Sequence, residues 1–117
     1  MVSFMEVIDR ALKGAFCSEK DFDLKVFVSK LREVIKKYEI KYDPENPIPS
    51  DNDLADRVFK AGVELYANVG TYCVDTERII RFTEEEIEEA LVTAPSAPVF
   101  GEGKEAKALV ARKPESD

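Results

Sequence analysis

Several acidic residues lie close enough together in the sequence to suggest a cation site. Asp43, Glu45, Asp51 and Asp53 fall within one short stretch, and Ca²⁺ prefers carboxylate oxygens as ligands. Their spacing does not match an EF-hand loop, and the segment 43–49 (DPENPIP) places prolines where such a loop must bend freely. The sequence therefore does not predict a calcium site.

The other reactive side chains do not form a catalytic or metal-binding set either. The chain has two cysteines, Cys17 and Cys73, which are far apart, and no histidine. A Cys/His zinc site is not expected, and the lack of histidine excludes a Ser-His-Asp or Cys-His unit. Cys73 lies in an apolar strand-like stretch, where we expect a buried, inert thiol. The acidic run 84–86 is explained by its place in the first turn of a helix. We therefore assign no catalytic, cofactor-binding or metal-binding residue to this sequence.

Charge and hydropathy restrict the partners. The 117 residues carry 24 acids and 17 bases, a net charge of −7, which argues against general binding to nucleic acid or to anionic membranes. Lys30, Arg32, Lys36 and Lys37 could form a basic patch, but a solvated helix face explains them better. The sequence contains no apolar run of the ~18–20 residues that a bilayer requires, and its start, MVSFMEVIDR, is unlike a signal peptide. We expect a cytoplasmic protein with free thiols.

The elements that would position these side chains are mainly helical. Apolar periodicity predicts helices over 4–13, 19–41, 51–69 and 84–93. Each begins at a hydroxyl residue followed three positions later by an acid, which is a capping signature. The pairs are Ser3 with Glu6, Ser18 with Asp21, Ser50 with Asp53, and Thr83 with Glu86. Gly14 and Gly70 suit helix C-termini. Gly62 suits either a close helix crossing or an exposed surface.

Two short β-hairpins are predicted on either side of the last helix. The first pairs 72–74 with 79–82 across a polar turn, and the second pairs 99–100 with 105–112. A lone two-stranded hairpin is marginal, so the first must pack against something else. Tyr38, Tyr66 and Tyr72 are expected to pack with their hydroxyls at the surface. The fold class is α+β, a single region 1–117 with a helical part (1–70) and a hairpin–helix–hairpin part (71–117). Residues 113–117 are expected to be loose.

A run of residues through the chain resembles the N-terminal part of the monomethylamine methyltransferases of methanogenic archaea. The residues that carry the resemblance are Phe59-Lys60-Ala61-Gly62, Gly70, Tyr72-Cys73, Asp75-Thr76, Arg78-Ile79, Thr83-Glu84, Glu86-Ile87 and Ala90. Weaker agreement comes from Asp23-Leu24 and from Phe100-Gly101-x-Gly103. Glu77 departs from the family, which often has histidine at this turn position.

The resemblance implies a much longer enzyme, in which this region precedes a TIM barrel and the subunits form a homo-oligomer. The family moves the methyl group of monomethylamine to the cobalt of a corrinoid on a separate protein, using a pyrrolysine encoded by an amber codon. That residue would lie well beyond Asp117, so the chain's end does not reflect termination there; an artificial truncation, a split gene or proteolysis would fit. No family catalytic residue corresponds to a position in this chain.

Three functions are compatible with these observations. The first is a structural N-terminal segment that braces the barrel or forms subunit contacts, which predicts exposed apolar faces. The second is a stand-alone, non-enzymatic helical interaction module whose elements close one core. The third, a self-contained enzyme, lacks a paired set of catalytic groups. Whether the chain is part of an enzyme is left open, but we expect no methyl transfer from it alone.

Overall fold

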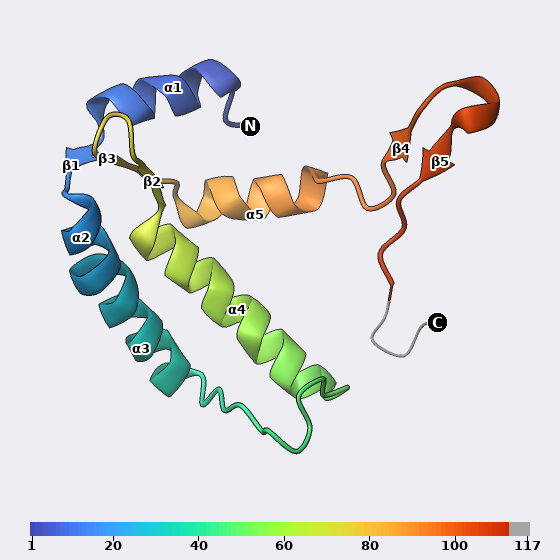
Figure 1. The fold of residues 1–117 in the computed structure, drawn as a ribbon, viewed down its shortest axis with the longest axis horizontal. Coiled ribbons are helices and arrows are strands. Elements are labelled where there is room, and N and C mark those ends of the chain that lie inside the picture. The colour runs from blue at the N-terminus through green and yellow to red at the C-terminus, as the bar shows by residue number, and fades with distance from the viewer. Residues whose placement is uncertain (113–117) are drawn as a thin grey trace.

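The computed structural model describes residues 1–112 and shows a mixed helical and β structure (Figure 1). The elements in chain order are α1 (Phe4–Lys13), β1 (Ala15–Phe16), α2 (Glu19–Asp21), the π-helix η1 (Phe22–Phe27), α3 (Val28–Lys37), α4 (Asn52–Val69), β2 (Thr71–Cys73), β3 (Arg78–Ile80), α5 (Glu84–Thr93), β4 (Val99–Phe100), the 3₁₀-helix η2 (Gly103–Glu105) and β5 (Lys107–Ala108). The predicted α+β class is confirmed for this part of the chain.

Local capping chemistry fixes the helix starts. Ser3 and Thr83 form the predicted capping boxes with Glu6 and Glu86, so α1 and α5 have the predicted bounds. Ser18 also caps its helix as predicted, because its hydroxyl accepts a hydrogen bond from the Asp21 amide at 3.3 Å. The fourth predicted cap, Ser50, is wrong. Asp51 caps α4 instead, and its carboxylate accepts from the amides of Asp53 and Leu54 at 2.9 and 3.4 Å.

The helix predicted over 19–41 differs in two ways. A π-helical stretch, η1, interrupts it, which adds a residue to the turn and rotates the following face. Its C-terminus is also earlier, at Lys37, because Glu39 adopts a positive φ of 52°. The Glu39 amide donates to the Lys36 carbonyl at 3.3 Å, and the Ile40 amide donates to the Ile35 carbonyl at 3.0 Å. These two bonds form a Schellman motif, which ends the helix before the proline segment.

The first hairpin is part of a larger sheet than predicted. β2 and β3 pair as an antiparallel hairpin, and β1, which was not predicted, pairs with the other edge of β3 to give the order β1-β3-β2. The sheet thereby joins the helical part of the chain to the hairpin part. Gly14 is extended rather than left-handed, but a Cβ there would collide with the Ile79 carbonyl. Gly70 does have the expected positive φ, at 75°.

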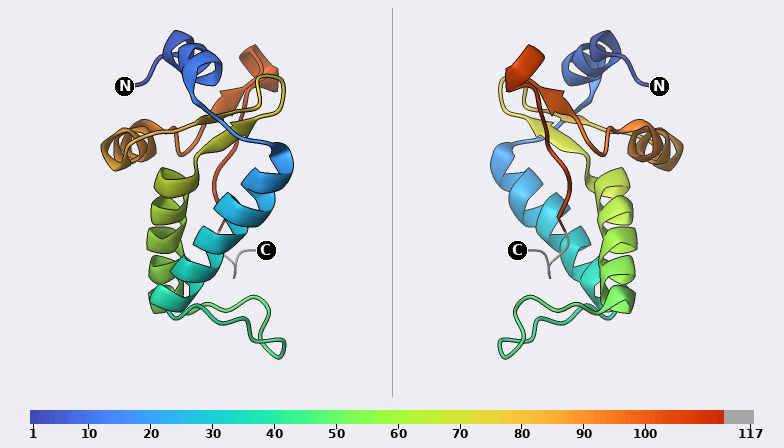
Figure 2. Two further views of the ribbon diagram at one scale, coloured as in Figure 1. Left: turned by 90° about the vertical axis from the view of Figure 1, so that its left-hand side faces the viewer. Right: turned by 90° about the vertical axis from the view of Figure 1, so that its right-hand side faces the viewer.

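The core is small and lies where the helices meet this sheet. Phe22, Val69 and Ile79 form a buried cluster, and the Phe22 ring stacks on Tyr72 with centroids 5.0 Å apart. The buried apolar residues of the described chain are Phe22, Val34, Ala61, Val69, Ile79, Ile80 and Ile87. The side views show α3 running beside α4 below the sheet, with α1 and α5 at the opposite end (Figure 2). Gly62 is exposed, with nothing within 4 Å of a Cβ built there, so it does not serve a close helix crossing.

The C-terminal hairpin extends from α5 as a separate arm (Figure 1). Its strands β4 and β5 pair as predicted, but β5 contains only Lys107–Ala108 instead of 105–112. η2 ends at Glu105, at the start of the predicted range. The radius of gyration is 17.7 Å, whereas a compact chain of this length has about 13 Å. The described part of the chain is therefore open in shape. The expectation for residues 113–117 lies outside the described residues. No helix within residues 1–112 is long and apolar enough to cross a membrane.

Candidate functional site

The acidic residues considered for calcium binding have local structural roles. The Asp43 carboxylate accepts a hydrogen bond from the Glu45 amide at 3.0 Å, which stabilises the turn, and Asp51 caps α4. Among residues 1–112, no three His, Cys, Asp or Glu side chains are grouped so that they could hold a metal ion. Backbone hydrogen bonds thus account for Asp43 and Asp51, and Asp53 pairs with Arg57 at 3.0 Å.

Cys73 and the tyrosines differ in part from expectation. Cys73 is half-buried rather than buried, and the neighbouring polar groups of Thr76 lower the pKa of its thiol. The Tyr66 hydroxyl lies at the surface beside Thr71, as predicted. The hydroxyls of Tyr38 and Tyr72 are partly buried instead, which corrects the prediction for both. Tyr38 donates to Glu64 at 2.8 Å, and Tyr72 donates to the Cys17 carbonyl at 2.7 Å.

The strongest polar contact joins α1 to α5. The Arg10 guanidinium donates two hydrogen bonds to the Glu86 carboxylate, at 2.6 and 2.7 Å, and a third to the Arg81 carbonyl at 3.1 Å. The guanidinium also lies 5.3 Å from the centroid of the Phe82 ring, a cation–π contact. Glu86 additionally accepts from the Thr83 amide at 3.0 Å. Hydrogen bonds from Arg10 and Thr83 lower the pKa of Glu86 to about 2.

A second carboxylate joins α3 to α4. Glu64 accepts from the Lys37 ammonium at 2.9 and 3.0 Å and from the Tyr38 hydroxyl, and Lys30 lies 3.7 Å away. These hydrogen bonds, led by that of Lys37, lower the pKa of Glu64 and raise the pKa of Lys37. Two of the four bases considered as a basic patch are therefore engaged in ion pairs within the chain.

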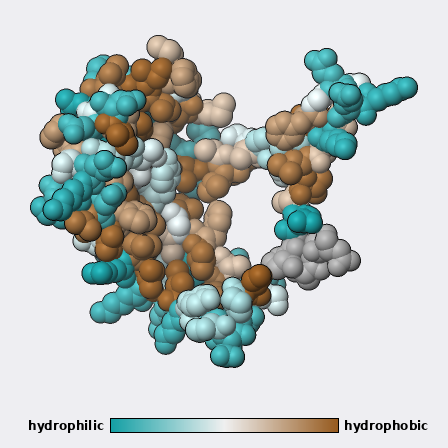
Figure 3. Space-filling model, in the orientation of Figure 1, coloured by the Kyte–Doolittle hydropathy of each residue, from teal (hydrophilic) through white to brown (hydrophobic). Residues whose placement is uncertain are grey.

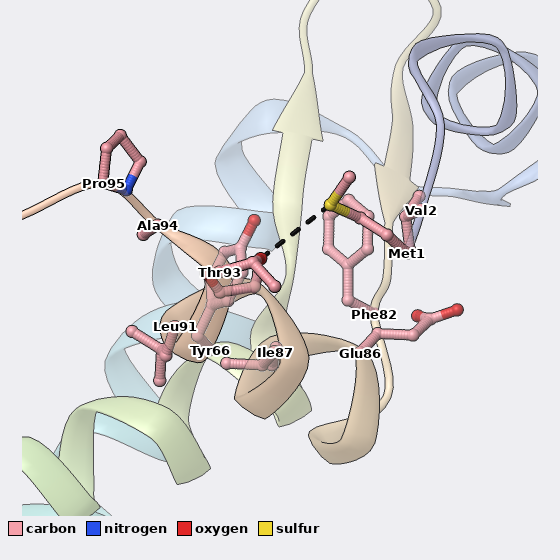
Figure 4. Close-up of a pocket in the computed structure, with 11 residues that line it drawn as sticks. Met1, Val2, Tyr66, Phe82, Glu86, Ile87, Leu91, Thr93, Ala94 and Pro95 are labelled. Atoms are coloured by element: carbon pink, nitrogen blue, oxygen red, sulfur yellow. Dashed lines mark hydrogen bonds between the residues drawn. The ribbon is translucent and has the colours of Figure 1, made fainter. Parts of the chain in front are cut away.

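An apolar hollow of about 670 Å³ lies beside α5, and we call it the α5 hollow (Figure 4). It is open to solvent. Its walls come from the N-terminus, α4, the segment between β3 and α5, and one face of α5. The lining residues are Met1, Val2, Tyr66, Phe82, Glu86, Ile87, Ala90, Leu91, Thr93, Ala94 and Pro95. The Thr93 hydroxyl donates a hydrogen bond of 3.8 Å to the Met1 sulfur and so connects α5 with the N-terminus. Sequence reasoning did not find this hollow, because its walls come from segments distant in the chain.

Large apolar side chains are exposed well beyond this hollow, as the first hypothesis predicted. Brown patches cover the helical body and the C-terminal arm in the space-filling view (Figure 3). α1 contributes Phe4, Met5, Ile8 and Leu12, α4 contributes Val58 and Phe59, α5 contributes Val92, and the arm contributes Val99, Phe100, Leu109 and Val110. Exposed apolar area of this extent is typical of surfaces that pack against another body.

The described part of the chain is thus an open α+β unit with a small core and broad exposed apolar faces. The sequence matches the family described as "Monomethylamine methyltransferase MtmB" over residues 2–117, and the chain belongs to this family.

Individual relatives agree with this assignment. Monomethylamine methyltransferase MtmB1 of Methanosarcina barkeri is 39% identical over 98 residues, which cover 84% of this chain and 21% of the relative. MtmB1 of Methanosarcina acetivorans is 36% identical over the same shares. The crystal structure of the M. barkeri enzyme superposes with a TM-score of 0.82 at 36% identity, over 92% of this chain and 23% of that chain. A crystal structure of a hydroxylamine complex of MtmB gives the same values. The chain thus spans about a fifth of the length of these curated relatives.

Proposed function

We propose that this chain acts as the N-terminal segment of a methyltransferase that moves the methyl group of monomethylamine to a corrinoid protein. Its own role in that enzyme is structural: it braces a catalytic barrel or forms contacts between subunits. The observation that carries the proposal is the combination of family membership over residues 2–117 with the broad apolar surface of an open fold.

The proposal includes the partners of the segment. The rest of the methyltransferase, a TIM barrel with a pyrrolysine at its active site, covers the exposed apolar faces, and the whole enzyme is a cytoplasmic homo-oligomer. The corrinoid is carried by a separate protein, and this segment binds no cofactor. The stabilising contacts of the segment, Arg10 with Glu86 and Lys37 with Glu64, hold its helices in position for this packing.

A chimera tests this role. The chain replaces the matching segment of the M. barkeri enzyme, and methyl transfer from monomethylamine to the corrinoid protein is measured. We expect the chimera to be active, with kcat and KM close to those of the M. barkeri enzyme. An M. barkeri enzyme without the segment should be inactive, and the 117-residue chain alone should transfer no methyl group. Activity of the isolated chain, or full activity of the shortened enzyme, would contradict the proposal.

A further inference from the structure

We propose that the α5 hollow receives an uncharged, apolar segment of the polypeptide that forms the rest of the family enzyme. This inference rests on the proposed function and adds to it the surface at which the segment meets that polypeptide. The lining of the α5 hollow is almost wholly apolar, whereas the hollow beside Tyr42 and Val58 also contains Lys41, Asp43 and Asp51.

The charged groups around the hollow are already paired, which favours an uncharged occupant. Its lining contains the Glu86 carboxylate, but both carboxylate oxygens are already bonded to Arg10. The ammonium group of Met1 pairs with Glu89 at 3.0 Å, and the Tyr66 hydroxyl pairs with Thr71. A methylammonium ion or a phosphate group would find its potential counter-charges already engaged in these pairs. Apolar side chains, which gain free energy by leaving water, fit this lining.

The length of the relatives indicates where the apolar segment comes from. Only 21% of the M. barkeri relative corresponds to this chain, so about four-fifths of that polypeptide lies outside the matched region. The same fold is found in the crystal structure of the relative, with a TM-score of 0.82 over 92% of this chain. The open shape therefore also exists where the rest of the polypeptide is present, and that polypeptide is the nearest source of an apolar segment.

A nicked form of the chimera tests the contact. A protease site is inserted after residue 117, and the chimera is folded as one chain. Cleavage then yields two pieces, this segment and the remainder of the M. barkeri enzyme. Ala90→Lys places a charge in the hollow at an exposed helical position, whereas Glu85→Lys places the same charge on α5 at an exposed polar position outside it. Circular dichroism of the isolated chain checks that both variants keep their helices.

We expect Ala90→Lys to raise the Kd between the two pieces about tenfold or more, because burial would leave the new charge unpaired. Glu85→Lys should change this Kd less than about twofold. Equal effects of the two substitutions, or no effect of either, would overturn the inference while an active uncut chimera still supports the proposed function. An inactive uncut chimera would instead refute the proposed function. A dimer of the isolated chain that Ala90→Lys dissociates would show that a second copy occupies the hollow, which also overturns the inference.

Discussion

Arg10 and Glu86 are 76 positions apart in the sequence, yet their side chains are joined by two parallel hydrogen bonds of 2.6 and 2.7 Å. Glu86 is also the third residue of α5, where it completes the capping box with Thr83. One carboxylate therefore fixes the start of α5 and attaches that helix to α1. The contact lies at the edge of the α5 hollow, so its loss should affect both folding and the shape of the hollow.

Stability should fall in acid because of this contact. The pKa of Glu86 is about 2 in the folded chain against an ordinary value of 4.5. Because the folded pKa is the lower one, the stabilisation is complete above about pH 4.5 and is lost as the pH falls towards 2. Urea midpoints measured from pH 7 to pH 2.5 should decline more steeply for the natural chain than for Glu86→Gln. Glu85→Gln, at an exposed position in the same turn, is the control and should keep the steep decline.

Removal of a central core side chain should destabilise the fold strongly. Ile79 is 5% exposed and packs with Phe22 and Val69 on the central strand of the sheet. Ile79→Ala should lower the free energy of unfolding by about 3 kcal/mol, measured by urea denaturation. Val92→Ala, at an 86% exposed position, should change it by less than about 0.5 kcal/mol. Equal effects would mean that the buried cluster is not the core.

The glycines should respond to substitution in opposite directions. A Cβ at Gly62 meets nothing within 4 Å, and the residue lies in the exposed interior of α4. Gly62→Ala should therefore stabilise the chain by about 0.5–1 kcal/mol, because alanine loses less backbone entropy on folding. Gly14→Ala should destabilise it by more than about 1 kcal/mol, since its Cβ would collide with the Ile79 carbonyl. Thermal unfolding of the two variants distinguishes them by the sign of the change in Tm.

The contact between α3 and α4 should depend on both partners of Glu64. Glu64→Gln removes the charge that Lys37 faces, and Tyr38→Phe removes a hydrogen bond to the same carboxylate. Each substitution should lower Tm, and the double variant should lower it by less than the sum of the two, because they share one carboxylate. Strict additivity would show that the Tyr38 hydroxyl does not interact with the Glu64 carboxylate.

Features set by neighbouring residues could be predicted from the sequence. The capping boxes at Ser3 and Thr83 gave the bounds of α1 and α5, since their signal lies within four residues. The cap at Asp51 was missed because Ser50, Asp51 and Asp53 offer competing signals of similar strength. The Schellman motif at Glu39 was missed because a non-glycine residue with positive φ has no clear sequence signature.

Features that depend on distant residues could not be predicted. β1 contains two residues, and only its pairing with β3 makes it a strand. The Arg10–Glu86 contact and the walls of the α5 hollow likewise join segments from both ends of the chain. The family resemblance was recognised from scattered residues such as Gly70 and Ile79, whose spacing reflects this long-range packing.

The strand order β1-β3-β2 also has a consequence for synthesis on the ribosome. The central strand is the last of the three to be made, so β1 and β2 have no partner until Ile80 has left the exit tunnel. At about 5–20 residues per second, β1 waits for several seconds after it is translated. The sheet therefore cannot form before β3 emerges, and β3 then supplies the hydrogen-bonding partner of both other strands.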